Sequence, residues 1–172
     1  METKVNLSEV AESIKGEVVA NDQMMNFWSD MLDGDSLAGA RLERFIFTNA
    51  RRMCTDFNGG QWKYVVLDKD AKIFYLYPNT GKQMQAEGVL NHASESLTPE
   101  LFGLITTMLS LAWHGDITGD EKYYSLFHKL REFTDNKLEA IMEPYEDMDQ
   151  SKWTEEARLA LDTSTAIYCF LD

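Results

Sequence analysis

Residues that commonly carry out catalysis or bind metals are few in this chain and are not grouped. His92, His114 and His128 lie in three separate segments, and Cys54 and Cys169 fit neither a CxxC motif nor the spacing of a zinc site. A nucleophilic Cys54 would need a histidine as its base, whereas a single cysteine near the end of an apolar helix pattern is typical of a small core residue. The chain also lacks the GxSxG, HExxH and GxxxxGK[ST] motifs. The sequence therefore predicts no catalytic residues, no metal ligands and no cofactor.

Two acidic groups have only a superficial likeness to functional sites. Asp116, Asp120 and Glu121 surround a glycine, but they lack the full frame and the terminal bidentate Glu of a calcium loop. A turn followed by a helix capped by Asp120 explains them better. Asp68 and Asp70 lie between two strand patterns, where a hairpin turn would expose both carboxylates rather than pair them as acid and base.

The formal net charge of the chain is −13, and it is unevenly distributed. Residues 1–36 carry a net charge of −6 and residues 143–156 a net charge of −5, whereas residues 37–142 are nearly neutral at −1. Such a chain is expected to repel nucleic acid, because binding phosphates requires clustered Lys and Arg. Two interpretations of the acidic ends stay open. They are solvated segments that aid solubility, or they imitate the phosphates of DNA and so block a DNA-binding enzyme.

Length and composition suit one compact protein. The 172 residues, 44% of them hydrophobic, are expected to form a single domain. No apolar run is long enough for a membrane span, and the first residues lack the layout of a signal peptide. Two cysteines that form no recognisable pair fit a reducing compartment. We therefore expect a cytoplasmic protein without membrane association.

The hydrophobic periodicity predicts an α+β fold, with a small antiparallel sheet of about three strands packed by several helices. Apolar positions at helical spacing predict helices at residues 36–55, from Thr98 to Gly115, from Asp120 to Pro144 and from Thr154 onward, with a further helical stretch at residues 7–14. Residues 62–67 and 73–77 are rich in aromatic and β-branched types, which predicts an antiparallel hairpin. Residues 82–90 predict a third strand, with Met84, Ala86, Val89 and Leu90 turned inward.

The junction between the first long helix and the hairpin is the most informative stretch of the chain. Residues 57–62 read Phe-Asn-Gly-Gly-Gln-Trp. An Asn-Gly-Gly run lets the backbone take positive φ without a Cβ clash, so a helix can stop and a strand can start within a few residues.

With its flanks, this junction resembles the ArdB/KlcA-type antirestriction proteins of plasmids, phages and other mobile elements. The resemblance runs from about Leu42 to Met142, and residues 37–142 form the family-like part of the chain. It rests on the segment Asp56–Trp62, which is similar to the family's Tyr-Asn-Gly-Gly-aromatic-Trp pattern, and on Phe74–Pro78 and Leu97–Gly103. The helix from Tyr124 to Phe133 completes the ordered set.

The resemblance implies a small α/β protein that relieves restriction by type I restriction–modification enzymes of the host cell. No catalytic residues are established for the family, so the expected action is contact with a protein partner, such as the restriction enzyme or an associated factor. The chain departs from the family in two places: Gln61 stands where an aromatic residue is usual, and residues 143–172 extend past the usual end. A DNA mimic and a small enzyme with an unrecognised site remain as alternatives.

A candidate partner surface follows from the junction and the hairpin. Aromatic residues on a sheet could stack nucleic-acid bases, but core packing or contact with a protein suits this acidic chain better. The predicted surface consists of Asn58, Gly59, Gly60, Gln61, Trp62, Tyr75 and Tyr77.

Overall fold

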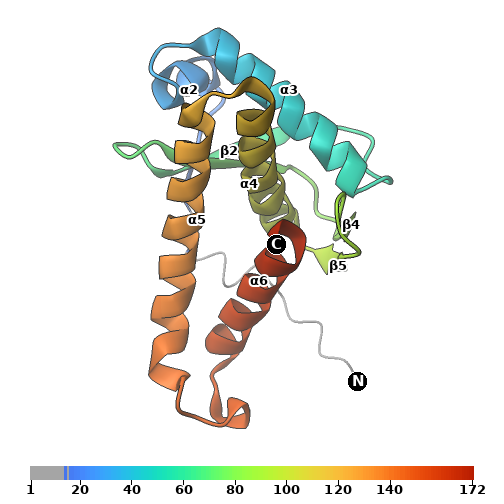
Figure 1. Ribbon diagram of the computed structural model, residues 1–172, viewed down its shortest axis with the longest axis vertical. Coiled ribbons are helices and arrows are strands. Elements are labelled where there is room, and N and C mark those ends of the chain that lie inside the picture. The colour runs from blue at the N-terminus through green and yellow to red at the C-terminus, as the bar shows by residue number, and fades with distance from the viewer. Residues whose placement is uncertain (1–13, 15) are drawn as a thin grey trace.

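The computed structural model describes residue 14 and residues 16–172. In Figure 1, α4 lies in the interior between α3, α5 and α6, and the strands cross beside it. The helices are α2 (Met24–Met31), α3 (Ser36–Met53), α4 (Pro99–Thr118), α5 (Glu121–Met142) and α6 (Glu155–Leu171). The strands are β1 (Glu17–Val18), β2 (Trp62–Asp68), β3 (Ile73–Pro78), β4 (Met84–Glu87) and β5 (Ser94–Leu97). The short 3-10 turns η1 (Glu143–Tyr145) and η2 (Gln150–Lys152) join α5 to α6.

The predicted α+β class and the predicted hairpin are both confirmed. β2 and β3 pair antiparallel, with Tyr64 opposite Leu76 and Val65 opposite Tyr75. Asp68 closes the turn by accepting a 2.8 Å hydrogen bond from the backbone N–H of Ala71. The third strand of this sheet is β1, which pairs with β2 on the side away from β3.

A strand forms within the predicted residues 82–90, but it does not join the sheet of the hairpin. β4 pairs with β5 in a separate two-stranded sheet and does not join β3. Met84 and Ala86 are buried as predicted, but Leu90 is 79% exposed, so the inward placement of Val89 and Leu90 was wrong. The chain turns back at Gly88, whose N–H donates to the Ala93 carbonyl, and this turn ends the strand before Val89.

The central helix α4 begins as predicted but ends later. The Thr98 hydroxyl accepts a 3.3 Å hydrogen bond from the Leu101 N–H, and Pro99 occupies the first turn. The predicted stop at Gly115 was wrong. The helix continues to Thr118 and ends at Gly119, whose φ of 67° is the left-handed conformation that glycine favours. Gly115 is buried instead against the ring of Tyr124.

Removing the Thr98 cap is expected to weaken the fold measurably. Because Thr98 is buried and satisfies one free N–H of α4, Thr98→Ala should lower the free energy of unfolding by about 1 kcal/mol. Urea denaturation followed by circular dichroism measures this loss. Thr98→Ser keeps the hydroxyl and should recover most of the stability; equal losses for the two variants would contradict a capping role.

α4 meets the outer edge of β3 at very short range. A Cβ at Gly103 would overlap the Leu76 carbonyl oxygen and the Cα of Tyr77, so only glycine allows the helix to cross this close. One turn later, the Thr107 hydroxyl accepts a 3.1 Å hydrogen bond from the Leu76 N–H and lies 3.4 Å from the Leu76 carbonyl, to which it can donate. The helix therefore satisfies backbone groups of β3 that a further strand would otherwise pair.

α5 and α6 run side by side and join at the end of the molecule farthest from α3 (Figure 1). The predicted helix starts are confirmed, since Asp120 and Thr154 both accept hydrogen bonds from first-turn N–H groups. α6 buries one apolar side, which consists of Ala157, Leu159, Ala160, Thr163, Ala166, Ile167 and Phe170. Contacts with α4 and α5 make α6 a part of the core.

Two other expectations concern the N-terminal part and membranes. The helical stretch predicted at residues 7–14 lies outside the described residues except for Ile14, which is buried in the core. Within the described part of the chain, no helix combines the length and apolar character that crossing a bilayer requires.

Candidate functional site

The helix-to-strand junction takes the conformation that its sequence predicts. α3 ends at Met53, and the backbone at Gly59 and Gly60 has φ values of 94° and 136°. Both values lie where side chains with a Cβ are disfavoured. The Gln61 carbonyl then accepts a 2.8 Å hydrogen bond from Asn79, which anchors the start of the hairpin.

The seven residues of the predicted partner surface do not lie on one face. Asn58, Gly60 and Gln61 are exposed, and Gly59 and Tyr77 are half-buried. Trp62 and Tyr75 are only 7% and 3% exposed. The strand register places Trp62 on one face of the hairpin, and Tyr75 and Tyr77 on the other. The exposed part of the predicted surface is thus the loop from Asn58 to Gln61.

An open hollow lies beside this loop. Its volume is about 400 Å³. Its lining consists of Asn21, Met24, Phe47, Gly60, Gln61, Trp62, Lys63 and Tyr64. The indole of Trp62 stacks on Phe47, with ring centroids 4.7 Å apart, and Phe57 meets the same indole edge-on. The hollow therefore combines aromatic walls with a polar glycine-containing rim, a combination that suits a protein contact.

A half-buried carboxylate, that of Glu43, binds Tyr64, which is one of the side chains that line this hollow. Glu43 Oε1 accepts a 3.2 Å hydrogen bond from Trp28 Nε1 and a second hydrogen bond from the Tyr64 hydroxyl. Burial, together with this bond to Glu43, raises the pKa of Tyr64 well above its ordinary value, so the phenol stays protonated. Sequence reasoning did not single out Glu43, because its helical position alone reads as part of a charged face.

The three histidines do not converge on one another. His114 packs between Phe45 and Tyr123, where burial, and then the charges of Lys122 and Arg41, lower its pKa. His92 and His128 are exposed on other elements. Among the residues that the structure describes, no three His, Cys, Asp or Glu side chains lie together as a metal site would require.

The two thiols are expected to react at very different rates. Burial raises the pKa of the Cys54 thiol and shields it from reagents, whereas Cys169 is exposed. A thiol reagent such as Ellman's should therefore titrate one cysteine in the native protein and both after unfolding. Cys169→Ser should remove the fast reaction. Equal native reactivity of both thiols would contradict the burial of Cys54.

Comparison with known proteins identifies the family of this chain. A family model described as an antirestriction protein matches residues 55–143, slightly more than half of the chain. The chain belongs to the antirestriction protein family. The match begins just before the Asn-Gly-Gly junction and ends one residue after α5, so α2, α3 and α6 lie outside it. The predicted resemblance is thus confirmed, and α6 lies within residues 143–172, which the resemblance would put past the usual end of the family.

The antirestriction protein also shares its fold with a solved structure. That structure is described as showing a novel fold for the KlcA and ArdB proteins, with antirestriction activity against type I DNA restriction systems in vivo but not in vitro. The two chains superpose with a TM-score of 0.62 at 24% sequence identity, over 70% of this chain and 84% of the other. No curated protein sequence matches this chain significantly.

Proposed function

We propose that this antirestriction protein relieves type I restriction in a bacterial host cell, on behalf of a mobile genetic element or phage, and that it does so through protein contacts rather than catalysis. The observation that carries this proposal is the family match over residues 55–143, together with a fold shared with the KlcA and ArdB proteins. Activity against type I systems is what is described for those two proteins.

Two further observations support this manner of action. The KlcA and ArdB activity is described as present in vivo but not in vitro, which favours a mechanism that needs a component of the cell besides the restriction enzyme. In this chain, the described residues hold no group of three His, Cys, Asp or Glu side chains that could bind a catalytic metal ion. A protein that acts by binding a cellular partner accounts for both of these observations.

The junction loop is the part of the predicted surface best placed to make such a contact. Gln61 is exposed at the rim of the hollow, Asn58 is exposed three residues before it, and the indole of Trp62 packs on Phe47. Aromatic walls with a polar rim match the anatomy of protein interfaces. Gln61, where the family usually has an aromatic residue, would then adapt the loop to the partner of this particular protein.

A plating assay tests the proposal. Phage carrying unmodified DNA should plate more efficiently on a host with a type I system when the chain is expressed. Asn58→Asp with Gln61→Glu should reduce this gain without changing thermal stability, whereas Gln83→Glu, on an exposed loop elsewhere, should not. No gain in plating by the parent chain would refute antirestriction, and full inhibition of a purified type I enzyme by the purified chain would refute the need for a further cellular component.

A further inference from the structure

One exposed face of α3 is lined with arginines, although the chain as a whole is strongly acidic. Arg41, Arg44, Arg51 and Arg52 are all exposed, and at 3.6 residues per turn they fall within an arc of about 100°. We call these four residues the arginine face. The helix contains a single acid, Glu43, and that carboxylate turns to the other side to bind Trp28 and Tyr64. No acid of α3 therefore offsets the arginine face.

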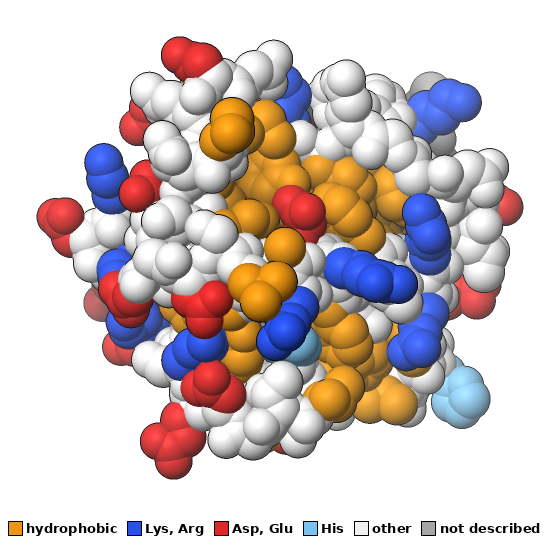
Figure 2. Space-filling model, turned by 90° about the horizontal axis from the view of Figure 1, so that it is seen from above, with side chains coloured by type: hydrophobic (Ala, Val, Ile, Leu, Met, Phe, Trp, Pro, Cys, Tyr) orange, Lys and Arg blue, Asp and Glu red, His pale blue; other side chains and the backbone are white. Residues whose placement is uncertain are grey.

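Among the described residues, no acid forms an ion pair with the arginine face. The ion pairs among the described residues involve Lys72, Lys122 and Arg131, and none involves these four arginines. Figure 2 looks down on this end of the molecule and shows Lys and Arg side chains gathered among apolar ones. Leu37, which is 62% exposed, continues the arginine face by one helical turn. Arginines beside an exposed apolar side chain are typical of protein interfaces.

The opposite end of the molecule carries the complementary charge. The turns after α5 and the first residues of α6 together hold six acids and one base, within residues 143–156. We call this segment the acidic tip; its acids are Glu143, Glu146, Asp147, Asp149, Glu155 and Glu156. All six acids are exposed, and so is the apolar side chain of Met148.

The acidic tip is held in shape by its own hydrogen bonds. Arg158 donates to the carbonyls of Gln150 and Ser151, at 3.3 and 2.9 Å, and Trp153 Nε1 donates to the Met148 carbonyl at 3.1 Å. The tip therefore presents its carboxylates from a defined backbone. A preorganised charged surface loses less entropy when it binds.

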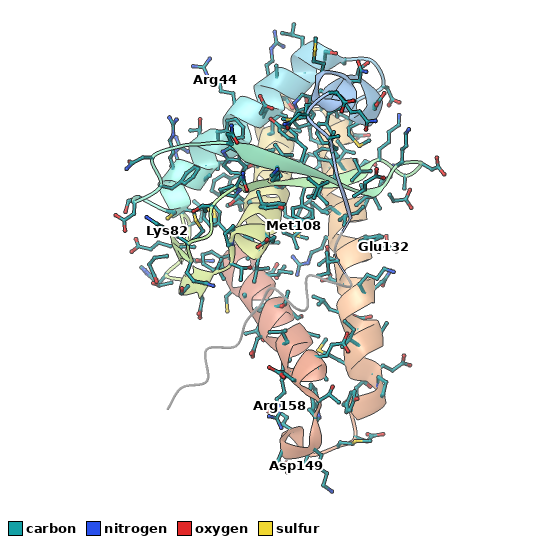
Figure 3. All side chains as sticks on the ribbon, turned by 180° about the vertical axis from the view of Figure 1, so that it is seen from behind. Arg44, Lys82, Met108, Glu132, Asp149 and Arg158 are labelled. Carbon is teal, nitrogen blue, oxygen red and sulfur yellow. The ribbon has the colours of Figure 1, made fainter. Side chains whose placement is uncertain are left out.

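The two surfaces lie too far apart to meet within one molecule. Figure 3 shows Arg44 pointing outward at one end and Asp149 at the other, with the length of α5 between them. We infer that the arginine face of one copy binds the acidic tip of a second copy, in an antiparallel dimer with two-fold symmetry. In such a dimer each copy offers both surfaces, so both contacts form at once. The dimer is independent of the proposed function, because it is a property of the purified chain alone.

Nucleic acid fits the arginine face less well. Four arginines along about 16 Å of helix provide few phosphate contacts, and the net charge of −13 repels a polyanion. A compact group of carboxylates matches the guanidinium groups better, because Arg and carboxylate pair through parallel hydrogen bonds. The acidic tip is such a group, and because it belongs to the same chain, it is present at the same concentration as the arginine face.

Charge reversal with sedimentation velocity tests the dimer. The parent chain should sediment as a dimer at about 0.1 M salt and shift toward the monomer at about 1 M, where the screening length falls from about 10 Å to about 3 Å. Arg41→Glu with Arg44→Glu, and separately Glu146→Lys with Asp147→Lys, should each weaken the dimer at least about tenfold. All four substituted residues are exposed, and none of them lies in the last turn of α3.

Mixing the two variants gives the decisive result. In a mixed dimer, the reversed arginine face of one variant meets the reversed acidic tip of the other. The second contact joins a native arginine face to a native acidic tip. Both contacts are therefore attractive, and the equimolar mixture should recover the parent's dimer. Lys82→Glu and Glu87→Lys, exposed reversals away from both surfaces, should leave the parent's sedimentation unchanged. A monomeric parent at low salt, or a mixture that stays monomeric, would overturn the inference. Duplex DNA that shifts the parent but not the Arg41→Glu, Arg44→Glu variant would assign the face to nucleic acid instead.

Discussion

Gly103→Ala is expected to destabilise the protein by about 3 kcal/mol or more, although alanine is the better helix former. In an open helix position this substitution would stabilise by about 1 kcal/mol. At Gly103 the new methyl group would overlap the Leu76 carbonyl oxygen and the Cα of Tyr77. Both atoms belong to the backbone of β3, so no side-chain rotation relieves the clash. Either α4 moves away from the sheet or the hydrogen bonds of Thr107 with Leu76 break.

Urea denaturation of the Gly103 variant measures this effect, with Gly81→Ala as the matched control. A Cβ at Gly81 would meet no atom within 4 Å, so Gly81→Ala should change the free energy of unfolding by less than about 0.5 kcal/mol. A Gly103→Ala variant that is as stable as the parent would show that α4 and β3 do not approach this closely. Expressed in cells, the destabilised variant should also lose antirestriction through lower abundance.

Phe74→Ala is expected to cost about 3–5 kcal/mol of unfolding free energy, the range for removing a buried phenylalanine. Phe74 is fully buried and meets Phe27 and Trp28 edge-on, with both ring centroids at 5.5 Å. Phe27 in turn contacts Tyr64 at 5.0 Å. The ring of Phe74 thus connects β3 to α2, and its loss leaves a cavity that separates the two elements.

Thermal and urea unfolding of three variants tests the cluster. Phe74→Leu fills part of the space and should cost less than Phe74→Ala, and Ile117→Ala, at a side chain that is 70% exposed, should change stability by under about 0.5 kcal/mol. Near-ultraviolet circular dichroism of Phe74→Ala should also weaken, because Trp28 loses its edge contact. A cost for Phe74→Ala as small as that of Ile117→Ala would refute the packing of this cluster.

The parts of the fold that the sequence predicts are those that short segments determine. Thr98, Asp120 and Thr154 each cap the helix that begins at the next residue, because a side-chain oxygen and an N–H two or three residues later are local partners. The hairpin likewise follows from two apolar runs and a polar turn. Family membership followed from the order of these segments and needed no tertiary contact.

The parts that the sequence does not predict depend on contacts between distant segments. β1 is two residues long, so only its pairing with β2 defines it as a strand. β4 pairs with β5 rather than with β3, because α4 occupies the outer edge of β3 through Gly103 and Thr107. The aromatic residues of the predicted partner surface face opposite ways, since the register of the hairpin alternates them.

The sequence did not predict the arginine face for a different reason. A count of charges along the chain treats Glu43 as balancing its neighbours, but the hydrogen bonds from Trp28 and Tyr64 hold that carboxylate on the other side of the helix. Net charge over a segment therefore concealed a surface that is basic only after folding.

The helix that covers the outer edge of β3 also affects how safely the chain can accumulate. An uncovered edge strand can recruit strands from other molecules and so begin amyloid-like growth. Here the Leu76 amide and carbonyl already have the Thr107 hydroxyl as their partner, and β1 covers part of the outer edge of β2. A cell can therefore hold a high concentration of this protein without strand-by-strand polymerisation through the central hairpin.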